Sequence, residues 1–117
     1  MKNNYAPGDI VLVKFPFSDL NSSKKRPALV LNQSRITDKV NLVTIAMITS
    51  KIEGIKISGD FKILHWKESG LLHPSLVRLS KLTTLEGDLV EKIMGKLLPV
   101  DLKGAKKSFQ KQFDFWV

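Results

Sequence analysis

Arginine is the side chain in this sequence whose position could matter most for chemistry on an anion. The chain carries nineteen basic residues, and only Arg26, Arg35 and Arg78 among them are arginine. Lysine provides a diffuse positive field, whereas a guanidinium group grips a phosphate with two parallel hydrogen bonds. Each arginine is therefore an individual candidate for binding a phosphate.

Other catalytic groups are absent or scattered. The sequence contains no cysteine, which excludes disulfides and thiolate metal sites. No group of His, Asp and Glu has the spacing of metal ligands, so we expect no metal and no other cofactor. His65 and His73 fall in a predicted connection and a predicted turn, where we expect ordinary surface or packing roles. The sequence thus lacks a convincing pair of histidines for acid–base chemistry on a phosphate, and electrostatic stabilisation by arginine is the natural alternative.

The charge of the whole chain points in the same direction. A formal net charge of +8 and an isoelectric point of about 9.8 favour a polyanionic partner, most commonly nucleic acid. The alternative is that the charge serves solubility alone. The first nine residues lack the apolar segment of a signal peptide, and no apolar run is long enough to span a membrane. We therefore expect a soluble, cytoplasmic protein with no membrane partner.

Two strands and the loop between them must position Arg26. Residues 10–17 are rich in β-branched and aromatic side chains, and they predict a strand that ends at or just after Pro16, because proline cannot donate to a central ladder. Residues 18–25 form a polar loop without periodicity, and residues 27–32 are a short apolar run typical of a buried strand. Arg26 then lies where the loop meets the strand, a place from which it can reach a substrate.

Further strands are predicted along the chain. Residues 42–49 are another apolar run, preceded at 33–39 by a connection with room for one helical turn. We predict a hairpin around Gly59 and a single helical turn that ends at Gly70. Residues 75–85 alternate apolar and polar side chains, as expected for a strand with one face in water.

The end of the chain changes to a helical pattern. Apolar residues recur at steps of three and four from Leu102 to Trp116, behind a potential N-cap at Asp101. Lysines fall mostly on the other side, where we expect a solvated face. The 117 residues fit one domain spanning 1–117, without linkers or repeats. The order of elements predicts a mostly β (α+β) fold, a small barrel or strongly bent antiparallel sheet with a C-terminal helix.

Several stretches of this sequence resemble the MazF/PemK/Kid family of type II toxin–antitoxin toxins. The first runs from GDIVLV at 8–13, through the proline before Phe17 and the polar loop, to KRPALVL at 25–31. The others are IAMITS at 45–50 and GLLHPSLVRLSKL at 70–82. Each stretch alone carries little weight, but together they cover most of the chain in the order and at the spacing of the family.

The resemblance implies a fold, an assembly and an activity. The fold would be the SH3-like barrel of the MazF/PemK/CcdB type, and the assembly a homodimer. The activity would be that of a bacterial mRNA interferase, which cuts single-stranded RNA at selected sequences without a metal and is neutralised by a cognate antitoxin. In such cleavage the 2′-hydroxyl of the substrate attacks the adjacent phosphorus, while the enzyme stabilises charge and assists proton transfer. Composition and periodicity by themselves lead only to a basic, mostly β domain.

The same resemblance makes Arg26 and Thr49 the candidate catalytic residues. Arg26 matches the arginine that the family needs for cleavage, and its permanent charge suits a phosphate clamp better than proton exchange. Thr49 matches a hydroxyl at the end of the third strand, although a strand-end threonine chosen for its β-propensity is the alternative. Arg78 matches the second arginine of the family.

Ser80 departs from one branch of the family, in which an acidic residue stands two positions after the second arginine. Because serine cannot act as a carboxylate base, the residue that moves the proton stays open. Asp19 in the first loop could supply it, or it could be a plain turn residue. Lys24 and Lys25 extend the positive charge beside Arg26 and would guide the RNA backbone. The candidate RNA-binding residues are Asp19, Lys24, Lys25, Arg78 and Ser80.

Other roles and functions stay open. Phe17 and Trp66 could stack on bases, or they could belong to the core or an interface. A CcdB-type gyrase poison shares this fold and acts through an aromatic C-terminal tail, which the FDFWV end of this chain resembles. Burial of Trp116 on the apolar stripe of the helix is the simpler interpretation of that tail. A non-catalytic RNA-binding module is favoured if Ser80 marks lost chemistry.

Overall fold

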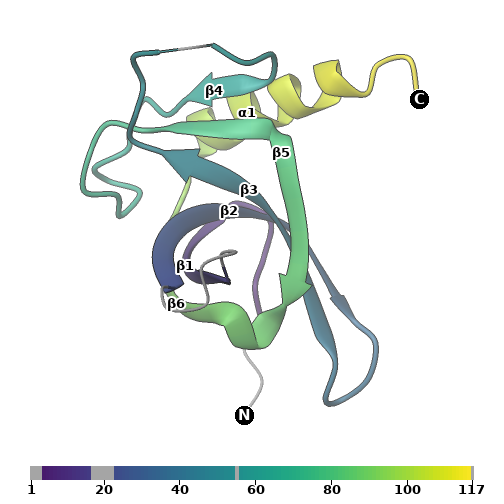
Figure 1. Ribbon diagram of the computed structural model, residues 1–117. Helices are drawn as coiled ribbons and strands as arrows, with labels where there is room; N and C mark the ends of the chain where they lie inside the picture. Colours follow the sequence, from purple (N-terminus) through teal and green to yellow (C-terminus); the bar gives the residue numbers. More distant parts are fainter. Residues whose placement is uncertain (1–3, 17–22, 55, 117) are drawn as a thin grey trace.

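The computed structural model describes residues 4–16, 23–54 and 56–116, and most of them belong to one antiparallel sheet. Its elements are β1 (Asp9–Pro16), β2 (Ser23–Arg35), β3 (Asn41–Thr49), β4 (Asp60–Lys62), β5 (Leu76–Glu86), the 3₁₀ turn η1 (Gly87–Leu89), β6 (Val90–Lys96) and the helix α1 (Pro99–Gln112). The strands pair in the order β4-β5-β3-β2-β1-β6, and the sheet curls so that β5, η1 and β6 lead round from one side to the other (Figure 1). The predicted mostly β fold with a C-terminal helix is confirmed.

The strand pair β1–β2 follows the prediction at one end and departs from it at the other. β1 ends at Pro16, as predicted. β2, however, already begins at Ser23 and pairs with β1 along its first half, with Arg26 opposite Val13. Residues 24–25 are therefore strand residues and not part of the polar loop, because pairing with β1 imposes an extended backbone that their side chains do not favour. Arg26 consequently lies inside a paired strand.

The connection between β2 and β3 is a hairpin turn. β2 continues three residues past the predicted end at Asn32, because its last part stays paired with β3. The helical turn considered for this connection is absent from residues 36–40. Instead, the Thr37 hydroxyl accepts a hydrogen bond of 2.9 Å from the backbone N–H of Val40. A side chain-to-backbone bond of this kind closes a turn and competes with helix formation.

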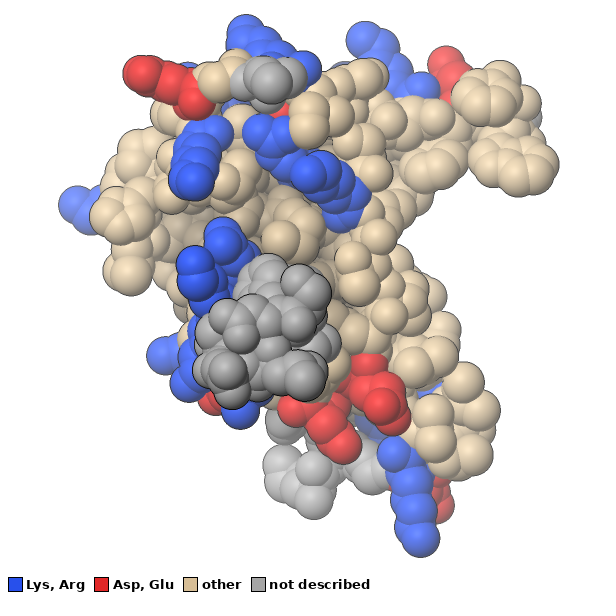
Figure 2. Space-filling model, in the orientation of Figure 1, with Lys and Arg blue, Asp and Glu red and all other residues tan. Residues whose placement is uncertain are grey.

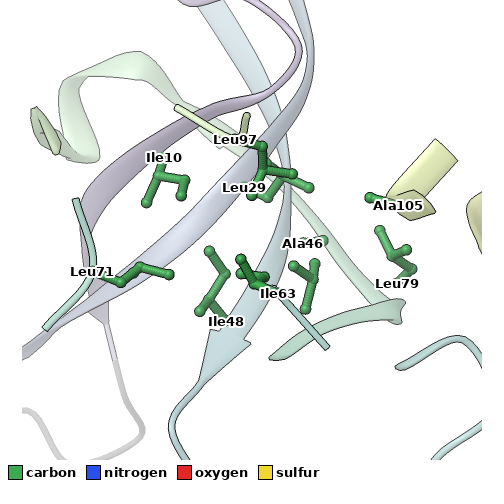
Figure 3. Packing of buried hydrophobic residues seen from close by; sticks show 10 residues of the cluster. Ile10, Leu29, Ala46, Ile48, Ile63, Leu71, Leu79, Leu97 and Ala105 are labelled. Atoms are coloured by element: carbon green, nitrogen blue, oxygen red, sulfur yellow. The ribbon is translucent and has the colours of Figure 1, made fainter. Parts of the chain in front are cut away.

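The sheet has an apolar cluster on each face. Along β1, Ile10 belongs to one cluster and its neighbour Val11 to the other, and both are fully buried. Continuous apolar runs are typical of strands buried on both faces, so the interpretation of the apolar runs in β2 and β3 as buried strands is confirmed. Figure 3 shows the cluster that α1 covers, where Ala105 of the helix faces Leu79 of β5.

The predicted hairpin around Gly59 is wrong. β4 pairs with β5, with Asp60 opposite Arg78, and residues 56–59 form only the turn that leads into it. Gly59 has a φ of 94°, and the Asp60 carboxylate closes the turn by accepting a hydrogen bond of 3.1 Å from the Ile57 N–H. The apolar pattern indicated extended chain correctly, but periodicity cannot tell which distant strand will be the partner.

The helical turn predicted to end at Gly70 is confirmed. The Ser69 N–H donates to the His65 carbonyl at 3.1 Å, and Gly70 has a φ of 95°, which favours glycine. A Cβ at Gly70 would run into the carbonyl of Met94 in β6. β6 itself is a strand that the sequence does not predict, because only Val90 of its side chains is buried and no alternation results.

α1 begins two residues before the N-cap predicted at Asp101. Leu98 is the N-cap and Pro99 occupies the first helical position, for which the fixed φ of proline is suited. Asp101 lies in the first turn, fully buried, and accepts hydrogen bonds from the backbone N–H groups of Leu64 (3.0 Å) and His65 (2.8 Å). Its carboxylate therefore ties the helix to the turn before β5 instead of capping it.

The surface of α1 follows the prediction, but the C-terminal tail does not. The helix lysines at 103, 106, 107 and 111 are all exposed, which confirms the solvated face. α1 ends at Gln112, so Phe115 and Trp116 lie beyond it and are 91% and 76% exposed. The predicted burial of Trp116 is therefore wrong, because the helix stops before the apolar stripe reaches it.

Candidate active site

One open pocket brings together several of the predicted site residues. It has a volume of about 510 Å³ and lies between β2, the end of β3, the segment 71–75 and β6. On the face shown in Figure 2, several Lys and Arg side chains stand out of an otherwise mostly uncharged surface, with fewer Asp and Glu, in keeping with the net charge of +8. The polar side chains that line the pocket are Lys24, Lys25, Arg26, Thr49, Ser50, Lys51, His73 and Ser75.

The pairing of β2 with β3 explains why Arg26 and Thr49 share this pocket. Ala28 of β2 lies opposite Met47 of β3. Arg26 and Thr49 each lie two residues further toward the same end of this strand pair, and residues two apart share a face. Strand register therefore joins two residues that are 23 positions apart in the sequence.

Thr49 is held in place at the end of β3. Its hydroxyl oxygen accepts a hydrogen bond of 3.1 Å from the backbone N–H of Lys51. A hydroxyl that accepts one bond keeps its own proton for donation. Thr49 can therefore donate to an oxygen of a ligand in the pocket.

The two lysines of β2 differ in their surroundings. Lys25 lies 3.5 Å from the Glu91 carboxylate of β6, which also lies 3.9 Å from Lys14 of β1. The Lys25 side chain is 52% exposed, and an ion pair this exposed contributes little stability, about 0–1 kcal/mol. Lys24 is exposed beside it. Both ammonium groups are thus accessible to an anion that enters the pocket.

Arg78 and Ser80 do not line this pocket. The Arg78 guanidinium lies 4.0 Å from the Asp60 carboxylate of β4, and their side chains are 17% and 12% exposed. β5 bulges here: Met47 of β3 is opposite Arg78, whereas the preceding residue of β3 is opposite Leu82. Ser80 lies in this irregular part and is exposed. The bulge takes Ser80 out of the regular ladder, whereas Arg78 stays in it, opposite Met47.

Asp19, Phe17 and Trp66 are further candidates for RNA contact from the sequence. Asp19 and Phe17 lie outside the described residues. Trp66 is half-buried and packs against the apolar cluster under α1, which fits the core alternative for this side chain.

His73 is a pocket residue that sequence reasoning missed, as it missed Ser50, Lys51 and Ser75. The sequence suggested a surface or packing role, but His73 lines the pocket with Arg26 and Thr49 and is exposed to solvent. Its backbone is anchored, because the buried Ser75 hydroxyl donates a hydrogen bond of 2.8 Å to the His73 carbonyl. The available signal was its place in the 70–82 stretch, just before β5 pairs with the end of β3.

Among residues 4–16, 23–54 and 56–116, no three His, Cys, Asp or Glu side chains are grouped so that they could hold a metal ion. Within the same part of the chain, no helix has the length and apolar character needed to cross a membrane.

Comparison with solved structures identifies the fold. A Mycobacterium tuberculosis toxin, MazF-mt6, superposes with a TM-score of 0.69 at 22% identity, covering 91% of this chain and 96% of that one. An endoribonuclease from a mycobacterial species, solved with its cognate antitoxin, gives a TM-score of 0.71 at 13% identity and covers 95% and 96%. A MazE–MazF crystal structure from Deinococcus radiodurans gives 0.69 at 18%, covering 95% and 98%. The SH3-like barrel expected from the resemblance is confirmed.

Sequence comparison identifies the family. No curated protein sequence gives a significant match. The family model described as PemK-like, MazF-like toxin of type II toxin–antitoxin system matches residues 6–113. This range contains all the stretches on which the resemblance rested. The chain therefore belongs to the PemK-like, MazF-like toxins of type II toxin–antitoxin systems.

Proposed function

We propose that this toxin is an endoribonuclease that cuts single-stranded RNA through attack of the 2′-hydroxyl on the adjacent phosphorus. The observation that carries the proposal is the joint position of Arg26 and Thr49 in one open, lysine-rich pocket. A permanent cation and a hydroxyl donor beside each other suit a phosphodiester whose oxygens gain charge in the transition state.

Each side chain has a distinct role in this proposal. Arg26 binds the non-bridging phosphoryl oxygens and stabilises their developing charge. Thr49 donates a hydrogen bond to the same group and helps to orient it. Lys24, Lys25 and Lys51 attract the backbone phosphates on either side, which accounts for affinity and not for sequence choice.

The reaction proposed here needs no metal. The 2′-hydroxyl supplies the nucleophile, and arginine and lysine supply the positive charge that a metal provides in other nucleases. Incubation of the purified toxin with single-stranded RNA in EDTA tests the proposal. We expect products with a 2′,3′-cyclic phosphate, or its opened form, and a 5′-hydroxyl. Cleavage of an all-deoxy strand of the same sequence at a similar rate would contradict the mechanism.

We further propose three features of the toxin in the cell. It acts in the bacterial cytoplasm as a homodimer, and a cognate antitoxin neutralises it. The mycobacterial endoribonuclease among the similar structures was solved with an antitoxin, which supports that partner. An antitoxin segment rich in acidic and apolar residues would compete with RNA for the positive charge of the pocket.

Gyrase inhibition is a second candidate, because the exposed tail favours it. Phe115 and Trp116 are accessible, so burial does not argue against a role for the aromatic C-terminus. If the protein neither cuts nor binds RNA but inhibits DNA supercoiling by gyrase, this candidate replaces the first. Bound but intact RNA would instead indicate a non-catalytic RNA-binding module.

A further inference from the structure

We infer that His73 is the general base that takes the proton from the attacking 2′-hydroxyl, an inference that rests on the proposed ribonuclease activity. Ser80 cannot act as a carboxylate base and does not line the pocket, so cleavage needs another proton acceptor. His73 is exposed and lines the same pocket as Arg26 and Thr49.

The chemistry of the pocket lining singles out this imidazole. Lys24, Lys25 and Lys51 are cations that can donate hydrogen bonds to a leaving oxygen but cannot accept a proton, and the same holds for Arg26. The hydroxyls in the lining are too weakly basic to accept one near neutral pH. No carboxylate is among the lining residues that the structure describes. Histidine is the side chain type that exchanges protons in this pH range.

The fold also holds His73 at the end of the sheet where Thr49 lies. β5 begins at Leu76, which lies directly opposite Thr49 of β3. His73 precedes that pair by three residues, on a backbone that the Ser75 hydroxyl anchors through its 2.8 Å bond to the His73 carbonyl. Ser75 itself is buried, with 4% of its surface exposed. His73 thus lines the pocket on a backbone held by a hydrogen bond, as suits a positioned base.

The reaction step needs no reagent other than water. The neutral imidazole of His73 takes the 2′-hydroxyl proton while the 2′-oxygen forms a bond to phosphorus. The bond from phosphorus to the 5′-oxygen breaks, and that oxygen leaves with its electron pair and takes a proton from water. A 2′,3′-cyclic phosphate and a 5′-hydroxyl result, and the imidazolium later returns its proton to the solvent.

The second histidine provides a matched control. His65 lies in the turn before β5, where its Nδ1 is 3.7 Å from the Glu68 carboxylate, and it does not line the pocket. His65→Gln and His73→Gln therefore remove the same group from two positions, only one of which lines the pocket with Arg26. Circular dichroism establishes that both variants fold.

The test measures single-turnover cleavage of RNA and binding of a non-cleavable all-deoxy strand. His73→Gln should slow cleavage by about 10²- to 10⁴-fold, the range typical of a lost acid–base group, with unchanged binding of the deoxy strand. The rate of the wild type should rise with pH, because only the neutral imidazole accepts a proton, and this rise should vanish in His73→Gln. His65→Gln should behave as the wild type, and added imidazole should partly restore His73→Ala.

Two results would overturn the assignment. One is that His73→Gln cuts RNA as fast as the wild type, while Asp19→Asn removes the rise of the cleavage rate with pH. The other comes from an RNA with sulfur at the 5′-bridging position, whose leaving group needs no proton: equal rates for the wild type and His73→Gln would make His73 an acid. A wild type that cuts no RNA would instead refute the proposed function itself.

Discussion

Arg26 illustrates how a single residue gains its function from the strands around it. Arg26 lies in a paired strand and lines a pocket that also contains Thr49, so the backbone that carries it is held by strand pairing. A rigid support means that little conformational entropy is lost when the phosphate binds. A loop at this position would provide the same charge with less defined geometry.

Substitution of Arg26 should separate catalysis from folding. Arg26→Ala should reduce RNA cleavage by about 10²- to 10³-fold, the typical cost of losing one charge-stabilising contact to the transition state. Arg26→Lys should also be poor, because an ammonium group cannot form the bidentate contact. Cleavage rates and the thermal midpoint should be measured together. Wild-type cleavage by a folded Arg26→Ala protein would remove this residue from the site.

Lys24 should contribute to RNA affinity through charge alone. Affinity for a single strand falls as salt rises, and each phosphate contact makes the slope of log affinity against log salt steeper by about 0.7. Lys24→Gln should therefore make this slope shallower by about 0.7 for a non-cleavable all-deoxy strand. The control is Lys39→Gln, since Lys39 is exposed in the β2–β3 turn and does not line the pocket. Equal slopes for the two variants would count against a phosphate contact at Lys24.

At the scale of elements, the segment between β4 and β5 and the helix α1 stabilise each other. The buried Asp101 carboxylate accepts two backbone hydrogen bonds from residues 64–65, and this segment leads to the turn that packs on β6. The same segment continues through residues 71–75, which line the pocket. The helix therefore holds the segment that continues to the pocket, although none of its own residues lines that pocket.

Loss of the Asp101 carboxylate should destabilise the fold. Asp101→Ala leaves two N–H groups without their partners, and each such loss costs about 1–3 kcal/mol when the group is buried. Asp101→Asn keeps one acceptor oxygen and should lose about half as much. Urea unfolding measures the change, with Asp114→Ala as the control, because Asp114 is exposed beyond the end of α1. A loss of similar size at both positions would contradict the role of Asp101.

Gly70 should be intolerant of a side chain for two separable reasons. Its φ of 95° is a conformation that costs other residues about 1–3 kcal/mol, and a Cβ would also run into the Met94 carbonyl. Gly54 has a φ of 143° but no atom within 4 Å of its Cβ position. Gly70→Ala should therefore lower the unfolding free energy more than Gly54→Ala. Equal losses would mean that the turn can move away from β6.

At the scale of the whole molecule, size and charge favour an assembly of two chains. A basic groove for extended RNA is easier to build across two copies of a 117-residue domain than within one, and closed two-fold dimers are the commonest assembly. We predict a homodimer whose RNA groove contains Lys25, Arg26 and Thr49. Light scattering at micromolar concentration measures the mass. A mass near 13.2 kDa together with full cleavage activity would show that one chain suffices.

The local features of this fold could be predicted from the sequence because their causes lie within a few residues. β1 extends to Pro16, the limit predicted for it, and Gly70 ends its turn through a positive φ. The apolar runs of β2 and β3 indicate strands buried on both faces. The motif stretches identify the family.

Only the tertiary structure decided which distant groups meet. β4 joins β5 and not a neighbouring segment, and β6 forms on β1 although its own side chains show no strand pattern. Asp101 binds backbone N–H groups 36 and 37 residues away, so its ability to cap a helix locally was misleading. His73 reaches the pocket through the register of β5 on β3. These outcomes depend on non-local backbone pairing and close packing, whose energies no short window of sequence contains.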